Sequence, residues 1–155
     1  MAMADPNGDP AAVKQDAKTG LWYDKAGNPT FKVEKDGTVD WYTSVGYLQY
    51  GANCLVCHGP DALGSSYAPN LTDSLTSLNY AEVYGIIVGG KRDVNASQDL
   101  VMPAWGDNKN VMCHINAIYV YLRARSDGAV GRGRPSKVAP KPAGYDEQEN
   151  KCFGD

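Results

Sequence analysis

The sequence has little positive charge and few histidines, and it lacks a long apolar run. Its 15 lysines and arginines are outnumbered by 18 aspartates and glutamates, which gives a formal net charge of −3 at pH 7. Nucleic acid is not expected as a partner, because binding phosphates requires a basic face. No apolar segment approaches the length that crosses a bilayer, so we expect no membrane insertion.

A signal peptide is also missing from the sequence as it stands. The residues from Met1 to Pro6 have neither the basic region nor the apolar region of such a peptide. The chain nevertheless has four cysteines, and an even number of cysteines is typical of proteins in oxidising compartments. We therefore expect the mature form of an exported, periplasmic protein.

The length of 155 residues fits one domain. Residues 1–20 are small and polar, and they are expected to form a flexible arm. The domain itself, residues 21–155, divides by composition into an N-terminal extension (21–43), a core (44–125) and a C-terminal tail (126–155). Aromatic and β-branched residues between turn signals predict a small hairpin in the extension. The tail is rich in Gly, Pro, Lys and Arg, which predicts irregular structure.

The core is expected to be mainly α-helical, with three helices. The first begins after Thr43 or Ser44 and continues to Asn53, because apolar residues recur there at helical spacing. The others are expected at 80–88, after Asn79 as N-cap, and at about 110–125. Residues 59–78 and 91–110 are expected to be loops.

The motif that carries chemistry is Cys54-Leu55-Val56-Cys57-His58. A Cys-x-x-Cys-His sequence is typical of covalent haem attachment. Two thiols separated by two residues reach the two vinyl groups at one edge of a porphyrin, and the adjacent imidazole becomes the proximal iron ligand. The sequence therefore predicts one covalent haem c, held by Cys54, Cys57 and His58.

These cysteines have two alternative uses. A zinc site would need two more ligands, which Cys113 and His114 could supply, but Cys113 lies on a predicted helix rather than on a short turn. A thioredoxin-like dithiol would need a βαβ setting, which the pattern lacks. A chance match is the remaining alternative to haem.

Met102 is the candidate for the sixth iron ligand. It lies in a predicted loop and is followed by Pro103, which stiffens the turn that presents the sulfur. Met112 fits better as a core residue of the last helix, and His114 is the alternative ligand. Trp105, just after the Met-Pro pair, is expected to pack near the haem.

Cys113 and Cys152 remain once the haem has taken two thiols. An even remainder in an exported chain predicts a disulfide, and two independent free thiols are the alternative. Such a disulfide would attach the tail to the last helix.

The order of these features resembles the class I cytochrome c fold. The resemblance implies that the carbonyl of Pro69 accepts the Nδ1 hydrogen of His58 and fixes the orientation of the imidazole. It also implies that Gly46 on the first helix faces an aromatic residue, such as Tyr119, on the last.

Three segments, 67–71, 88–92 and 101–106, together with the aromatic extension and the tail ending in Cys152, resemble cytochrome cL. The resemblance to that family implies that this protein is a monomeric periplasmic electron carrier rather than an enzyme. Its donor would be a PQQ-dependent (quinoprotein) methanol dehydrogenase of the calcium or lanthanide type, and its acceptor another cytochrome c or an oxidase. The alternatives are a general soluble carrier and a haem enzyme or gas sensor with a displaceable distal ligand.

The basic residues near the C-terminus have two interpretations. They could steer docking to an acidic partner, or they could simply form a solvated basic tail. The residues concerned are Arg123, Arg125, Arg132, Arg134, Lys137 and Lys141.

Overall fold

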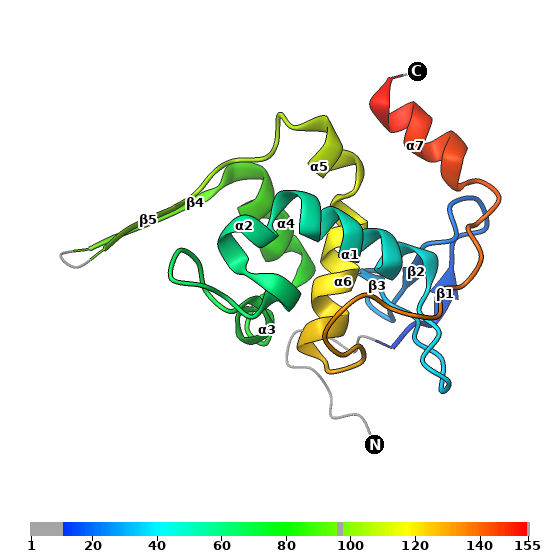
Figure 1. The fold of residues 1–155 in the computed structure, drawn as a ribbon. Helices are drawn as coiled ribbons and strands as arrows, with labels where there is room; N and C mark the ends of the chain where they lie inside the picture. Colours follow the sequence, from blue (N-terminus) through cyan, green and yellow to red (C-terminus); the bar gives the residue numbers. More distant parts are fainter. Residues whose placement is uncertain (1–10, 96–97, 155) are drawn as a thin grey trace.

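The computed structural model describes residues 11–95 and 98–154 (Figure 1). The helices are α1 (Trp41–Asn53), α2 (Leu55–His58), α3 (Leu71–Ser74), α4 (Tyr80–Gly89), α5 (Lys109–Cys113), α6 (Ile115–Ser126) and α7 (Tyr145–Phe153), and Pro60–Ala62 form the short 3₁₀ turn η1. The strands are β1 (Lys14–Gln15), β2 (Trp22–Tyr23), β3 (Pro29–Thr30), β4 (Lys91–Asn95) and β5 (Gln98–Met102). The predicted mainly α fold is confirmed. Among the residues described, no helix is long and apolar enough to cross a membrane.

Helix α6 forms the centre of the molecule. Residues 117–124 are all buried, so this helix is covered on every side and not only along one apolar face. Helix α1 crosses it where Gly46 lies against the backbone of Ala117 and the side chain of Tyr121. The expected partner of Gly46, Tyr119, instead packs its ring against Tyr80 of α4. The aromatic residue of α6 that faces Gly46 is therefore Tyr121, which lies two residues, or about half a helical turn, beyond the predicted Tyr119.

Helix α1 begins at Trp41, three or four residues earlier than predicted. Asp40 is its N-cap, and its carboxylate accepts hydrogen bonds from the backbone N–H and the hydroxyl of Thr43 at 3.0 and 2.6 Å. The same carboxylate accepts the N–H of Lys32 at 2.8 Å. Asp40 therefore joins the start of α1 to the N-terminal extension.

The N-terminal extension is a three-stranded antiparallel sheet in the order β1-β2-β3. The predicted hairpin is present, but the predicted arm is not loose over its described part. Lys14 and Gln15 pair with Tyr23 and Trp22, and the turn between them is closed by Asp16. Residues 1–10 of the arm lie outside the described residues. The division into domains stays a prediction.

The two predicted loops contain regular structure. Residues 59–78 include η1 and α3, and the strands Lys91–Asn95 and Gln98–Met102 pair as the antiparallel β4–β5, which extends away from the helical body (Figure 1). The sequence of this hairpin is largely polar and has no clear alternation, so its backbone pairing was not predictable from hydrophobic pattern.

The tail is more ordered than its composition indicated. Its chain forms a parallel bridge between Val138 and Val39 and ends in α7. The disulfide predicted between Cys113 and Cys152 is present and attaches α7 to α5. The prediction of a disulfide-pinned tail is confirmed, and the prediction that this tail is irregular is wrong for residues 145–153.

Candidate functional site

The Cys-x-x-Cys-His motif lies where α1 passes into α2. Cys54 ends α1 and also caps α2, with its N–H 2.8 Å from the carbonyl of Tyr50. The N–H of His58 bonds the carbonyl of Cys54 at 3.0 Å, which closes one helical turn around the motif. This turn brings Cys54, Cys57 and His58 to the wall of the same cavity.

His58 is held as a neutral imidazole. Its side chain is only 6% exposed, and its Nδ1 lies 3.2 Å from the carbonyl oxygen of Pro69. A carbonyl can only accept, so Nδ1 carries the hydrogen and Nε2 keeps its lone pair. Burial lowers the pKa of His58 against the opposing effect of the Pro69 bond, which favours the form that binds metals.

Met102 reaches the cavity from the end of β5. The loop that follows it is tied to the end of α4, because Trp105 and Gly106 donate to the carbonyls of Ile87 and Val88 at 2.9 and 3.1 Å. Gly90 approaches this loop so closely that a Cβ there would lie 2.7 Å from the carbonyl oxygen of Met102. Its φ of +76° also favours glycine.

One cavity therefore collects every predicted haem-site residue. Cys54, Cys57, His58, Pro69, Met102 and Trp105 all line it, although they come from three segments of the chain. The rest of the wall is mostly aliphatic, and its apolar members are Ala68, Leu71, Leu75, Leu78, Val83, Ile86, Ile87, Val101, Pro103, Ile118 and Leu122. Two thiols, an imidazole and a thioether facing an apolar cavity fit a covalent haem with two axial ligands.

The alternative uses of the cysteines fit the geometry poorly. Burial, with a smaller effect from Cys57, raises the pKa of Cys54 to about 11, whereas a redox dithiol needs a thiolate. Cys113 is unavailable as a zinc ligand because it is bonded to Cys152. Within the described residues, no three His, Cys, Asp or Glu side chains are grouped as a metal site would require.

Comparison with known proteins agrees with a covalently bound haem at this site. The model of the family "Cytochrome C oxidase, cbb3-type, subunit III" matches residues 43–122, more than half of the chain. Cytochrome c-555 of Methylococcus capsulatus is 33% identical over 100 residues, covering 64% of this chain and 75% of that protein. The chain belongs to the c-type cytochromes.

Two more relatives support the assignment of this cytochrome. Cytochrome c-553I of Paracoccus denitrificans is 46% identical over 136 residues, which are 88% of this chain and 60% of that protein. The crystal structure of the c-type cytochrome XoxG from Methylobacterium extorquens AM1 superimposes with a TM-score of 0.83 at 51% identity. That match covers 92% of this chain and 86% of the other. The cytochrome is thus a class I, single-haem electron carrier with covalent haem c.

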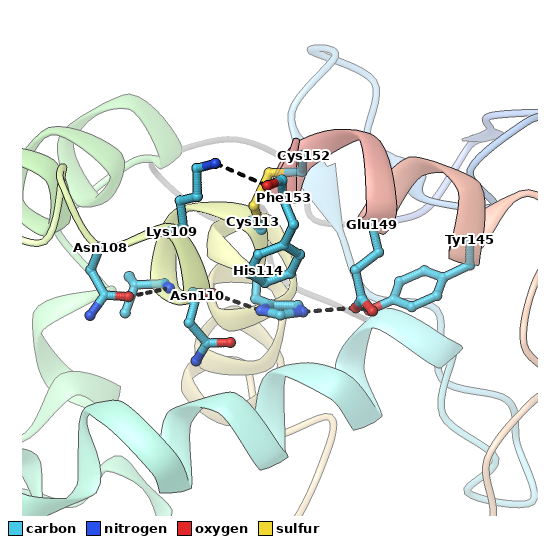
Figure 2. Close-up of a disulfide and its surroundings, with 10 residues drawn as sticks. Asn108, Lys109, Asn110, Cys113, His114, Tyr145, Glu149, Cys152 and Phe153 are labelled. Carbon is cyan, nitrogen blue, oxygen red and sulfur yellow. Dashed lines mark hydrogen bonds and ion pairs between the residues drawn. A yellow bond between two sulfur atoms is a disulfide. The ribbon is translucent and has the colours of Figure 1, made fainter. Parts of the chain in front are cut away.

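His114 takes no part in the cavity wall. Its Nδ1 lies 2.7 Å from the carbonyl of Asn110 and its Nε2 lies 2.8 Å from a carboxylate oxygen of Glu149 (Figure 2). The hydrogen bond from His114 is the main cause of a lowered pKa for Glu149. Both ring nitrogens of His114 are therefore engaged, Nδ1 with α5 and Nε2 with α7, which favours a structural role over iron ligation.

The prediction that Arg123 steers docking or belongs to a solvated basic tail is wrong. The residue is buried in α6, and its guanidinium donates to the carbonyls of Leu75 and Leu78, each at 2.7 Å. Both leucines line the haem cavity. Arg123 therefore fixes one wall of the cavity, a role that sequence alone did not reveal.

Other basic residues of the tail also have partners within the protein. Arg125 donates to the carbonyl of Asp61, and Arg132 pairs with the carboxylate of Asp61 at 3.1 Å. Lys141 pairs with Asp146 at 2.9 Å. These contacts favour a structural role for this part of the tail over steering of a partner.

Proposed function

We propose that this cytochrome is a periplasmic acceptor of single electrons from a quinoprotein methanol dehydrogenase, and that it passes them to a second cytochrome c or an oxidase. The resemblance to cytochrome cL suggests this donor. The three segments that carry this resemblance all contribute to the cavity wall, through Pro69, Lys91 and Met102 among others. The disulfide supports an oxidising compartment such as the periplasm.

The roles of the site residues follow from their positions. Cys54 and Cys57 are assigned as the thioether attachment sites, and His58 and Met102 as the axial ligands. The bound haem supplies one-electron oxidation and reduction. Pro69 keeps the His58 ring in one orientation, and the apolar wall, including the partly buried Trp105, excludes water. Ligands fixed in this way limit the structural change that accompanies electron transfer.

The observation that carries the proposal is an exposed apolar rim at the haem cavity. Tyr67 and Val101 both line the cavity, yet they are 72% and 58% exposed. Val56, inside the haem-binding motif, is 80% exposed. Exposed apolar groups beside an electron-transfer site suit a small, transient interface with a redox partner.

Stopped-flow spectroscopy tests this proposal. Oxidised cytochrome is mixed with purified methanol dehydrogenase and methanol, and reduction is followed in the haem α-band. We expect rapid, saturable reduction, and comparison of calcium and lanthanide enzymes identifies the type of donor. Negligible reduction by both enzymes, with an intact six-coordinate spectrum, would reject this donor and favour a general soluble carrier.

A pair of variants tests the apolar rim. Val56→Glu places a charge on the rim, whereas Val13→Glu places the same charge on the N-terminal arm, where Val13 is 60% exposed. We expect the second-order rate constant for reduction to fall about tenfold in the first variant only, because docking loses roughly 1–2 kcal/mol. Equal rate constants for the two variants would place the docking surface elsewhere.

Carbon monoxide binding separates the electron carrier from a haem enzyme or gas sensor. If Met102 is the sixth ligand, the ferrous protein should bind carbon monoxide weakly and slowly. Rapid, tight binding would show an easily displaced distal ligand and would favour the enzyme or sensor.

A further inference from the structure

The haem cavity has an uneven distribution of charge. Among the described residues that line it, Lys91 is the only lysine or arginine, and there is no aspartate or glutamate. The other polar side chains of the wall, apart from those assigned to the haem iron, are neutral, and they belong to Asn53, Tyr67, Ser74 and Trp105. A single ammonium group therefore supplies the formal charge of an otherwise neutral wall.

The backbone fixes Lys91 next to the proposed iron ligand. Lys91 is the first residue of β4, and it pairs directly with Met102 at the end of β5. Gly90, the residue before Lys91, lies so close to the carbonyl of Met102 and the backbone nitrogen of Ala104 that no side chain fits between them. Lys91 thus keeps its position relative to Met102 even though its side chain is exposed.

Haem brings two negative charges to this cavity, because the porphyrin carries two propionate groups. Carboxylates beside an apolar wall are stabilised by a nearby cation. A cation at this place also favours the ferrous state, since the ferric iron carries one positive charge more. We propose that Lys91 is the cationic partner of a haem propionate and that its charge raises the reduction potential of this cytochrome.

This role makes Lys91 a positioning and tuning residue. The proposed role of Lys91 requires that haem occupies the cavity, but it does not depend on which dehydrogenase donates the electron. Arg92, the next residue of the same strand, has the same charge and is exposed, but it does not line the cavity. Successive side chains of a strand point to opposite faces, so Arg92 provides a matched control.

The test is a potentiometric titration of the haem-loaded protein and its variants. For Lys91→Gln we expect the potential to fall by an amount equal to a roughly threefold to tenfold shift of the ferric–ferrous equilibrium. Tenfold corresponds to about 59 mV for one electron. Lys91→Arg should keep the wild-type potential, and Lys91→Glu should lower it further. Arg92→Gln should change it by less than half of the Lys91→Gln shift.

The absorption spectra of the variants show whether His and Met ligation is intact. Spectra that stay unchanged while the potential falls would support an electrostatic role. An unchanged potential in Lys91→Gln would overturn the proposal, and so would an equal shift in Arg92→Gln, which would indicate a general surface field. If Lys91→Gln does not take up haem, the order Lys91→Arg above Lys91→Glu decides the question, and equal potentials reject it. Because no dehydrogenase is present, failure here leaves the proposed donor untouched.

Discussion

The contact between α1 and α6 provides the sharpest test of the packing argument. At Gly46 a methyl group would overlap the carbonyl oxygen of Ala117 and would lie 2.7 Å from the Cβ of Tyr121. Neither neighbour can rotate away, because one is backbone and the other is the first atom of a side chain. Gly46→Ala therefore forces the two helices apart along the most extensive helix–helix contact of the core. Overpacking of this kind costs about 1–3 kcal/mol, and we expect about 3 kcal/mol or more because the overlap is with rigid atoms.

Gly51→Ala is the matched control, since Gly51 is also in α1 and a Cβ there meets nothing within 4 Å. Alanine is the better helix former, so this variant should gain up to about 1 kcal/mol. The free energy of unfolding of both haem-loaded variants is measured by denaturant titration, with circular dichroism as the signal. A loss below about 1 kcal/mol for Gly46→Ala would refute the close crossing of α1 and α6.

Three further predictions concern the ends of the fold. Replacing Cys113 and Cys152 together by serine should lower the free energy of unfolding by about 4 kcal/mol, because the disulfide closes a loop with a sequence separation of 39; a loss below about 1 kcal/mol in denaturant titrations would show that the tail docks without it. Asp40→Ala should cost about 1–2 kcal/mol through loss of the α1 cap, while Asp36→Ala, which removes only an exposed turn contact, should change stability by less than about 0.5 kcal/mol. The lowered pKa of Glu149 means that its carboxylate contributes fully to the stability of the fold above its ordinary pKa of 4.5. This contribution is lost as the pH falls through the lower folded-state pKa. The difference in melting temperature between wild type and Glu149→Gln should therefore shrink below pH 4.5, and a constant difference would contradict the His114–Glu149 interaction.

The covalent part of the haem site was predictable because its chemistry is local. Cys54, Cys57 and His58 must be adjacent in sequence to reach one porphyrin edge and its iron, so a five-residue pattern is sufficient. Met102 was proposed from a similarly local signal, since it lies in a predicted loop and is followed by Pro103. Pro69 came from family resemblance, because nothing local marks which carbonyl will face His58. The assignment of these residues as haem ligands remains a prediction.

The missed secondary structure had weaker local signals. Helix α7 follows a segment rich in proline and glycine, which obscured the acidic residues Asp146 and Glu147 in its first turn and Lys151 in its last. Those charges complement the helix dipole and could have identified the helix. The hairpin β4–β5 offers no comparable signal, because its strands are stabilised by backbone pairing between residues that show no period-two pattern.

Arg123 shows why the wall of a cavity is harder to predict than its ligands. A single arginine near the end of a helix is normally solvated, and burying its charge without partners would cost several kcal/mol. Here the cost is offset by two carbonyl oxygens, those of Leu75 and Leu78, and by the hydroxyl of Tyr119 at 3.0 Å. The two carbonyls lie 48 and 45 residues away in sequence, and they become acceptors only because the segment after α3 folds against α6. The burial of Arg123 thus follows from the tertiary fold and not from its neighbours in sequence. The same holds for Lys91, whose sequence context shows a basic turn but not that its side chain lines the cavity.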